Sequence, residues 1–290
     1  MGYPIIIRSK SAQKASPIEI VYDEMDLTNY LGQLTEISDI KPAILDVFLE
    51  DAVKVHVDVI SDGTEALVCG VMEHIEQAAI NSGDSACSAP PFSLSEEVIS
   101  KISECAKAIG SANKLTGLYN VQFAISGQQI YILEAMSGPS VTIPMLCKLT
   151  GTNWISANID ILNGRKLSET NIKETSNNQM FGVKETVFPF SRFPGSEVIL
   201  GPEMKSTGQV MGIDTSFAQA YIKAQLAAGQ VIPEFGNVFV SVADCDKEYL
   251  PEIGKKLTEL GYSIVATRGT GKYLKEHGVN ARVIGKIGEG

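Results

Sequence analysis

A glutamine and a glutamate near the middle of the chain have the types and spacing of magnesium ligands. Residues 118–125 and 129–135 have the pattern of two strands, and the turn at 126–128 is typical of a β-hairpin. Gln122 and Glu134 are nearly equidistant from the turn, so a tight register makes them cross-strand neighbours to within about one residue. Amide and carboxylate oxygens suit a Mg²⁺ ion that bridges nucleotide phosphates. An ordinary polar sheet face has the same spacing, so both interpretations stay open.

Residues 267–270 have the composition of an anion-binding turn. This Thr-Arg-Gly-Thr segment leaves a predicted strand and opens a predicted helix. Backbone N–H groups at such a helix start, with two hydroxyls and a guanidinium, form a cradle for an anion. A common turn between a strand and a helix explains the same four residues, and the sequence alone does not decide between the two.

A third polar cluster covers residues 72–77 and 81–88, at the end of a predicted strand and in the loop after it. Its Glu, Asp and Ser oxygens suit a monovalent cation or an ammonium group. A polar loop with turns stabilised by Asp and Ser has the same composition. The other histidines, His56 and His277, lie far from His74 in the sequence, so His74 by itself offers little to a metal.

Composition excludes several classes of protein. The five cysteines are scattered without a C-x-x-C pair, which predicts a reduced, cytoplasmic chain without structural zinc. No apolar run reaches the roughly 18 residues of a membrane span, and residues 1–10 do not resemble a signal peptide. The net charge is −10 and no dense Lys/Arg stripe is present, so we expect neither a membrane nor a nucleic acid as partner.

The elements that must position these residues follow from the hydrophobic pattern. Length and apolar content predict two domains. The predicted strands of one antiparallel sheet are 5–7, 43–50, 53–59 and 67–75. Helices are predicted after Ser93, where Ser93 and Glu96 have capping-box spacing, and at 143–149 and 154–162. Residues 165–179 are polar and unpatterned, which indicates a connector.

Strand and helix patterns alternate from about residue 235, which predicts a parallel sheet. The expected elements are a strand at 238–242, a helix at 247–260, a strand at 262–266, a short helix after Thr270 and an apolar stretch at 279–284. These residues number about half of what a domain of this pattern needs. Residues 5–7 also resemble an internal strand, so we expect the chain to be cut at both ends.

Several stretches resemble the large chain of carbamoyl-phosphate synthetase, in particular its second ATP-grasp half. They are MEHIEQ with SGDSACS, GLYNVQFAI, KETVFPFSRFPG, LGPEMKSTGQVMGI with SFAQAYIKAQLAAG, and VATRGTGKYLKEHGV. Their order and spacing resemble the family over almost the whole chain. The resemblance implies α/β and α+β structure in three parts. These are the end of an ATP-grasp domain with an antiparallel sheet and helices (1–165), an ordered connector (166–229), and the start of a Rossmann-like, methylglyoxal-synthase-like allosteric domain (230–290).

The resemblance also implies a reaction, partners and ligands. In the family this half phosphorylates carbamate with MgATP to form carbamoyl phosphate, for pyrimidine and arginine biosynthesis. A glutaminase small subunit or domain and a nucleotide effector such as UMP or IMP are the implied partners. The positions that match family ligands are Arg8, Gln122 and Glu134 for ATP, its phosphates and Mg²⁺; Asp46, His74, Glu76 and Ser85 for potassium; Glu76, Asp84 and Glu185 for ornithine, which activates some members; and Ser241, Lys247, Thr267, Thr270 and Lys286 for the effector phosphate.

The matched ATP site departs from the family at several points. Residues 9–16 replace a proline and a glycine-rich phosphate loop that ends in arginine, although Lys10 and Lys14 keep positive charge there. Met136 replaces an asparagine, and a thioether is a poor Mg²⁺ ligand. Gly138 and Val141 replace arginines that neutralise charge during phosphoryl transfer.

Two further departures lie elsewhere in the same site. Lys54 stands where the family has an acid that holds the ribose hydroxyls, and Asn81 stands where it has a histidine. Sheet and core positions still resemble the family, which suggests a retained fold with relaxed chemistry. The chain is therefore either part of an ATP-dependent ligase that is impaired on its own, or a non-catalytic module for effector binding or subunit association.

Overall fold

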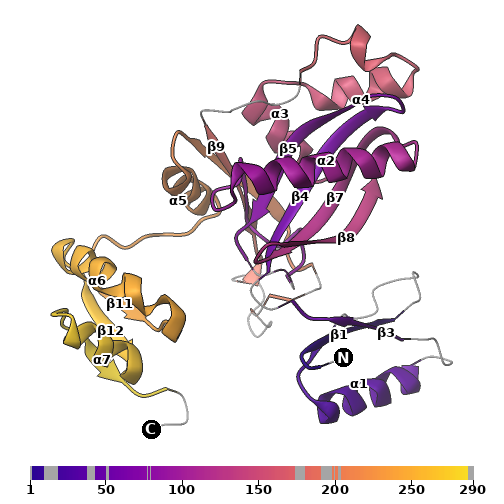
Figure 1. The fold of residues 1–290 in the computed structure, drawn as a ribbon. Helices are drawn as coiled ribbons and strands as arrows, with labels where there is room; N and C mark the ends of the chain where they lie inside the picture. Colours follow the sequence, from indigo (N-terminus) through magenta and orange to yellow (C-terminus); the bar gives the residue numbers. More distant parts are fainter. Residues whose placement is uncertain are drawn as a thin grey trace. The chain divides into compact units, whose positions relative to one another are not determined.

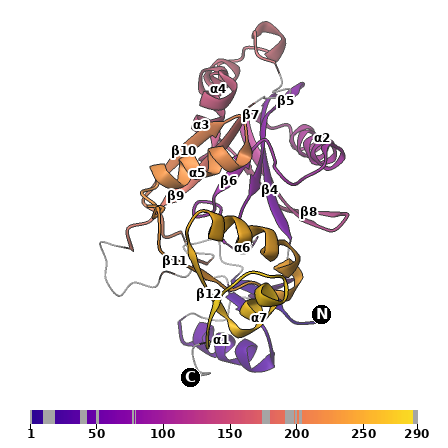
Figure 2. The same cartoon turned by 90° about the vertical axis from the view of Figure 1, so that its left-hand side faces the viewer.

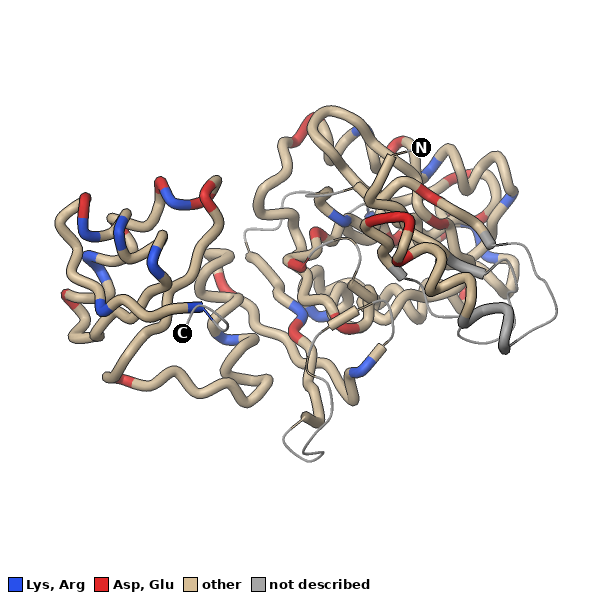
Figure 3. Tube along the Cα trace, turned by 90° about the horizontal axis from the view of Figure 1, so that it is seen from below, with Lys and Arg blue, Asp and Glu red and all other residues tan. Residues whose placement is uncertain are grey.

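The computed structural model describes residues 2–9, 19–37, 43–49, 52–76, 78, 80–173, 180–190, 198, 200–201 and 204–286. The chain divides into two compact units, Met1–Gln230 and Val231–Gly290, which are described separately below (Figure 1). Acidic and basic residues are interspersed along the trace of both units (Figure 3). Among the described residues, none of the helices combines the length and the hydropathy needed to cross a bilayer.

A small antiparallel sheet forms the first part of the larger unit. Its strands are β1 (Ile5–Ser9), β2 (Glu19–Val21) and β3 (Ala43–Val47), in the order β2-β1-β3, and α1 (Glu24–Ile37) packs on it. Ile5, Ile7, Val21 and Tyr30 form its core. The prediction of one antiparallel sheet was therefore wrong, because the strand pattern of residues 5–7 does not specify a pairing partner.

The main sheet has seven antiparallel strands in the order β10-β9-β6-β5-β4-β7-β8. The strands are β4 (Val53–Asp62), β5 (Ala66–His74), β6 (Cys87–Ala89), β7 (Thr116–Ser126), β8 (Gln129–Ser137), β9 (Phe181–Val187) and β10 (Gly208–Asp214). β9 and β10 come from the expected connector, so those residues complete the sheet. α5 (Phe217–Ala227) packs against them.

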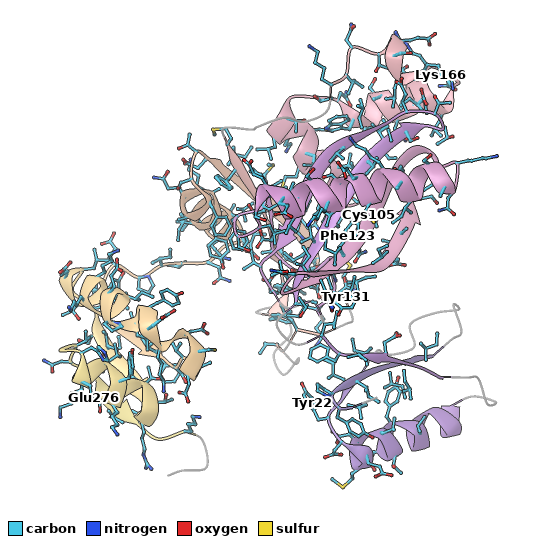
Figure 4. All side chains as sticks on the ribbon, viewed as in Figure 1. Tyr22, Cys105, Phe123, Tyr131, Lys166 and Glu276 are labelled. Carbon is cyan, nitrogen blue, oxygen red and sulfur yellow. The ribbon has the colours of Figure 1, made fainter. Side chains whose placement is uncertain are left out.

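Helices cover both faces of the main sheet (Figure 2). The alternation of β4 puts Val55, Val57 and Val59 under α2 (Glu96–Ala112), together with Phe123, which is labelled in Figure 4. The opposite face packs against α3 (Ile143–Thr150) and α4 (Trp154–Leu162).

The start of α2 corrects one prediction. Ser95, and not Ser93, is the N-cap, and its hydroxyl accepts a hydrogen bond from the backbone N–H of Val98. The Ser93 hydroxyl instead donates to Glu73 on β5, which also accepts the backbone N–H groups of Phe92 and Ser93. Ser93 is therefore bound by the buried carboxylate of Glu73, and it does not cap the helix.

The smaller unit has a parallel sheet, which confirms the predicted alternation. β11 (Asn237–Val240), β12 (Ser263–Thr267) and β13 (Arg282–Ile284) lie in the order β11-β12-β13. A 3₁₀ helix (Asp244–Tyr249) precedes α6 (Leu250–Glu259), and α7 (Arg268–Glu276) follows β12. Leu250, Ile264 and Leu274 lie in the core between them.

Candidate functional site

A cavity of about 700 Å³ lies in the larger unit, with walls from both of its sheets. Its size is in the range of small-molecule sites. Its lining residues are mainly apolar, with a small number of polar groups. They include Ile6, Asp46, Phe48 and Leu49 from the first sheet and the segment after it, Lys54 from β4, Asn81 and Ser82 from a loop, Gln122 from β7, and Tyr131, Leu133, Glu134 and Met136 from β8.

The hairpin places the predicted magnesium ligands opposite each other. Gln122 on β7 pairs directly with Glu134 on β8, and a bulge follows at Gln122/Phe123. The Ser82 hydroxyl donates to Oε1 of Gln122 at 3.2 Å, which orients the amide. Met136 is the neighbour opposite Asn120 and lines the same cavity. The backbone of Arg8 pairs with Ile44 in the first sheet, and its side chain lies outside the described residues.

The residues present fit one magnesium ion that is shared with phosphate oxygens. Mg²⁺ in phosphate sites commonly takes one or two protein oxygens and completes its shell with phosphate and water. Gln122 and Glu134 could supply those two oxygens, since both line the cavity and pair with each other. Within the described residues, no three His, Cys, Asp or Glu side chains converge to hold a metal ion on their own. The apolar walls suit a purine ring.

Lys54 places a positive charge in the wall of this cavity. Its side chain is buried, and Nζ donates to the carbonyl of Ile80 at 3.1 Å. Burial lowers the pKa of Lys54 to about 8, the charge of Glu134 acts in the opposite direction, and Lys184 lowers it further. From the sequence, Lys54 is noted only as the replacement of an acid in the family, and its positive charge in the cavity is not considered.

The three predicted ornithine residues are held by the chain's own donors. Glu76 accepts the Ser85 hydroxyl at 2.7 Å and the backbone N–H of Ala86 at 2.6 Å. Asp84 accepts the backbone N–H groups of Lys205 and Ser206 at 2.6 and 3.0 Å. Glu185 accepts Gln225 from α5 and the N–H of Thr186. These contacts give each carboxylate a structural role, and ornithine binding stays a prediction.

Replacing Asp84 by Ala should destabilise the larger unit by about 2 kcal/mol, because the N–H groups of Lys205 and Ser206 lose a charged acceptor. Urea unfolding followed by the fluorescence of Trp154, which is the only tryptophan and is fully buried, measures this loss. Asp160→Ala is the control, since its partner Arg165 is exposed and such pairs contribute about 0.5 kcal/mol. Equal losses in the two variants would contradict the prediction.

The potassium residues lie on different parts of the fold. Asp46 is on β3 and lines the cavity, whereas Glu76 and Ser85 contact each other beyond the end of β5. His74 instead contacts His56 of β4, with 2.9 Å between Nε2 and Nδ1. The long sequence separation of the two histidines is therefore misleading, and potassium binding stays a prediction.

A buried polar chain continues from these histidines. Thr142 donates to Oδ2 of Asp58 at 2.9 Å and lies 2.9 Å from Nε2 of His56. A hydroxyl has one proton, so Thr142 accepts from Nε2–H of His56, and Nδ1 of His56 accepts from His74. In the described part of the chain, Oδ1 of Asp58 and Nδ1 of His74 are buried without a hydrogen-bond partner.

Burial sets the charge states along this chain. It lowers the pKa of His56 to about 3 and that of His74 well below the usual range, and the charges of Lys54 and Lys184 act in the same direction. Burial raises the pKa of Asp58 to about 6, against hydrogen bonds from Ser140 and Thr142. Both histidines are therefore neutral near pH 7.

The smaller unit gathers most of the predicted effector residues at the start of α7. The hydroxyl of Thr267 lies 3.3 Å from that of Ser241 and 3.2 Å from that of Thr270. Lys247 forms an ion pair with Asp244, and its Nζ lies 3.4 Å from where a Cβ on Gly269 would stand. Lys286 is exposed and helps to lower the pKa of Asp244, after Lys247. Hydroxyls and ammonium groups here suit an anion.

Two family descriptions match this chain. Residues 1–170 match "Carbamoyl-phosphate synthase L chain, ATP binding domain", and residues 250–290 match "MGS-like domain". The carbamoyl phosphate synthase large chain of Pasteurella multocida is 44% identical over 290 residues, which are all of this chain and 27% of the relative. The C-terminal section of that protein from Aquifex aeolicus is 42% identical over 307 residues, covering 57% of its length. The chain thus spans about a quarter of the length of full-length relatives.

Two solved structures with this fold are carboxylases of low sequence identity. The biotin carboxylase domain of Hydrogenobacter thermophilus 2-oxoglutarate carboxylase, a complex with MgADP, ADP and bicarbonate, has a TM-score of 0.56 and 14% identity. It covers 72% of this chain and 53% of its own. Campylobacter jejuni biotin carboxylase has a TM-score of 0.53 and 17% identity, with 64% and 42% coverage. Fold, family match and relatives agree, and the chain belongs to the carbamoyl-phosphate synthase large-chain family, through its ATP-binding domain.

Proposed function

We propose that this chain is part of a carbamoyl-phosphate synthase large chain and that its cavity is the ATP site of the carbamate-phosphorylating half. MgATP supplies the γ-phosphoryl group, which is transferred to a carbamate oxygen and gives carbamoyl phosphate and ADP. The observation that supports this most is the direct pairing of Gln122 and Glu134 at the wall of a cavity of nucleotide size. The reaction belongs to cytoplasmic, glutamine-dependent pyrimidine and arginine biosynthesis, with a glutaminase subunit or domain as partner.

The residues of the cavity divide the binding work. Glu134 and Gln122 would hold a metal ion that is shared with the phosphates, and the Ser82 hydroxyl keeps the Gln122 amide in its orientation. Apolar side chains such as Phe48 and Leu133 exclude water from the base. These contacts position the nucleotide, which is the main contribution of a protein to phosphoryl transfer.

The same site has lost charge-neutralising groups, so we propose that turnover by this chain alone is impaired. Met136 offers sulfur where the resemblance implies a further metal-binding oxygen, in addition to those of Gln122 and Glu134. The backbone at Gly138 has a φ of 103° and Val141 is exposed, and neither side chain has a donor for a transferring phosphoryl group.

Glu134→Gln should abolish the gain in ATP affinity that Mg²⁺ provides. We expect the parent chain to bind ATP weakly, with a Kd on the order of 100 µM in Mg²⁺ and about tenfold higher in EDTA. The neutral amide is a poorer Mg²⁺ ligand, so the variant should have the EDTA value under both conditions. Isothermal titration calorimetry measures both values.

Glu104→Gln on the exposed face of α2 is the matched control and should keep the Mg²⁺ effect. A Kd of a few micromolar for MgATP would contradict the weakened site, since it is far below the expected value on the order of 100 µM. If Mg²⁺ changes the ATP affinity equally in the Glu134 and Glu104 variants, Glu134 is not a metal ligand.

A second candidate function is a non-catalytic module that binds an effector or a partner subunit. The grouping of Ser241, Thr267, Thr270 and Lys247 at the start of α7 favours it, because those groups suit a phosphate monoester. Titration with UMP or IMP in parallel with MgATP distinguishes the two. Effector binding without any ATP binding would support the module and contradict the ligase.

A further inference from the structure

Two lysines are buried near the cavity, and neither forms an ion pair with a carboxylate in the described part of the chain. Lys54 lines the cavity, and Lys184 contacts the loop that carries Ser82. Lys54 on β4 is 7% exposed and Lys184 on β9 is 2% exposed. Nζ of Lys54 donates to the carbonyl of Ile80, and Nζ of Lys184 donates to the carbonyls of Ser82 and Gly83 at 3.3 Å. Both charges are therefore held by neutral carbonyls of one loop.

The described part of the protein alone does not replace the hydration that the Lys54 ammonium loses on burial. A buried ammonium loses its hydration, and lysines are rarely buried unless a negative group pairs with them. Lys54 has three N–H donors, and the structure gives one of them a protein acceptor. Lys184 adds positive potential at this ammonium, since its charge lowers the pKa of Lys54. An anion in the cavity would offset both effects.

The position of Lys54 identifies which part of a ligand it meets. Lys54 pairs with Ala124 on β7, and Gln122 lies two residues further along that strand on the same face. Glu134 pairs with Gln122 and is the carboxylate with the largest effect on the Lys54 charge. The ammonium is therefore a neighbour of the metal ligands. The resemblance implies that an acid at this position holds the ribose, so the phosphate group next to the ribose is the one within reach of Lys54.

We propose that Lys54 forms an anion subsite in the cavity, where its ammonium binds a phosphate group of the nucleotide directly, without a metal ion between them. The inference rests on the proposed nucleotide site for the identity of the ligand. Lys184 does not line the cavity and acts as a positioning residue, because it holds the carbonyls of the loop that also carries Ser82. The shared chemistry is a phosphate group, whether free or on a nucleotide.

Calorimetric titration in EDTA tests the subsite with pyrophosphate, ADP and adenosine. Pyrophosphate and ADP should bind the parent chain without metal, and Lys54→Met should raise both Kd values about tenfold or more, since a charge-assisted hydrogen bond is lost. Adenosine has no phosphate, so its affinity should not change. Lys148→Met on the exposed side of α3 removes the same charge and should leave every Kd within about twofold.

Two further results decide the matter. Lys54→Arg keeps the charge and should retain binding in EDTA, which separates the loss of charge from a general defect; the fluorescence of buried Trp154 reports whether each variant is folded. Unchanged Kd values in Lys54→Met, or binding of ADP and pyrophosphate only with Mg²⁺, would overturn the subsite. Binding of pyrophosphate through Lys54, with no binding of ADP or adenosine, would support the subsite and reject the proposed nucleotide function.

Discussion

Acidification from pH 6.5 to 3 should destabilise the larger unit by an amount on the order of 4 kcal/mol. His56 and His74 take up protons near pH 6.5 when unfolded, whereas burial keeps the pKa of His56 at about 3 and that of His74 well below its usual value. Between these values the unfolded chain binds more protons, so stability rises with pH and is lost as pH falls. Above pH 6.5 the histidines are neutral in both states, and the larger unit has its full stability.

One group on the same buried chain acts in the opposite direction. The pKa of Asp58 is raised from 3.8 to about 6, so the folded state binds this proton more tightly, and that contribution to stability is lost as pH rises through the same window. Two histidines outweigh one carboxyl. The free energy of unfolding therefore still rises with pH, as the histidines alone would require.

Urea unfolding between pH 4 and 7, followed by the fluorescence of Trp154, measures the slope in the larger unit only. His56→Gln should flatten it, because one titrating ring is removed. His277→Gln changes an exposed histidine of the smaller unit and should leave the slope unchanged. A midpoint that is independent of pH in the parent chain, or an equal slope in His56→Gln, would contradict the assignment of the effect to these rings.

The sequence predicts the Gln122 and Glu134 pair well because a hairpin is local. A short turn sets the register, so the spacing of two residues around it predicts that they face each other, and β7 and β8 pair as expected. The alternation of strand and helix patterns predicts the parallel sheet of the smaller unit, and the resemblance to a known family adds the mixed fold; the structure confirms both.

Contacts between distant strands could not be predicted in the same way. His56 meets His74 because β4 and β5 pair antiparallel, and their shared register depends on packing of the whole sheet. Lys184 reaches the loop at Ser82 from a strand about a hundred residues further along the chain. Asp84, a predicted ornithine residue, also accepts the N–H groups at 205 and 206, which lie about 120 residues further along the chain. In each case a tertiary contact determines what a polar residue does.

This distinction bears on the candidate ATP site. Its proposed metal ligands come from one local hairpin, whereas the positive charge near them comes from Lys54 and Lys184 on two other strands. A change in that charge can therefore alter how phosphate is bound while the Gln122 and Glu134 pair is kept. The fold and the metal ligands are thus a weaker guide to turnover than the complete set of charges in the cavity.

Gly212→Ala should destabilise the larger unit by about 3 kcal/mol, because the backbone of α5 lies directly against β10 at this residue. A Cβ there would stand 2.1 Å from the carbonyl oxygen of Ala220 and 2.5 Å from the backbone nitrogen of Ala224. Backbone atoms of a helix cannot rotate away as a side chain can, so α5 must move off the strand. Gln225 on α5 donates to Glu185, and that contact should weaken as well.

Gly208→Ala is the matched control, since it lies on the same strand with no atom within 4 Å of the added Cβ. It should change stability by at most about 0.5 kcal/mol. Urea unfolding at pH 7 gives both values, and a loss in Gly212→Ala no greater than that in Gly208→Ala would show that α5 is not held by close packing here. A large loss would show that α5 supports β10 and its neighbour β9. β9 carries Lys184, which donates to the loop that contains Ser82. Phosphate binding through Lys54 should then weaken in Gly212→Ala as well, because that loop carries the carbonyl of Ile80 that holds its ammonium.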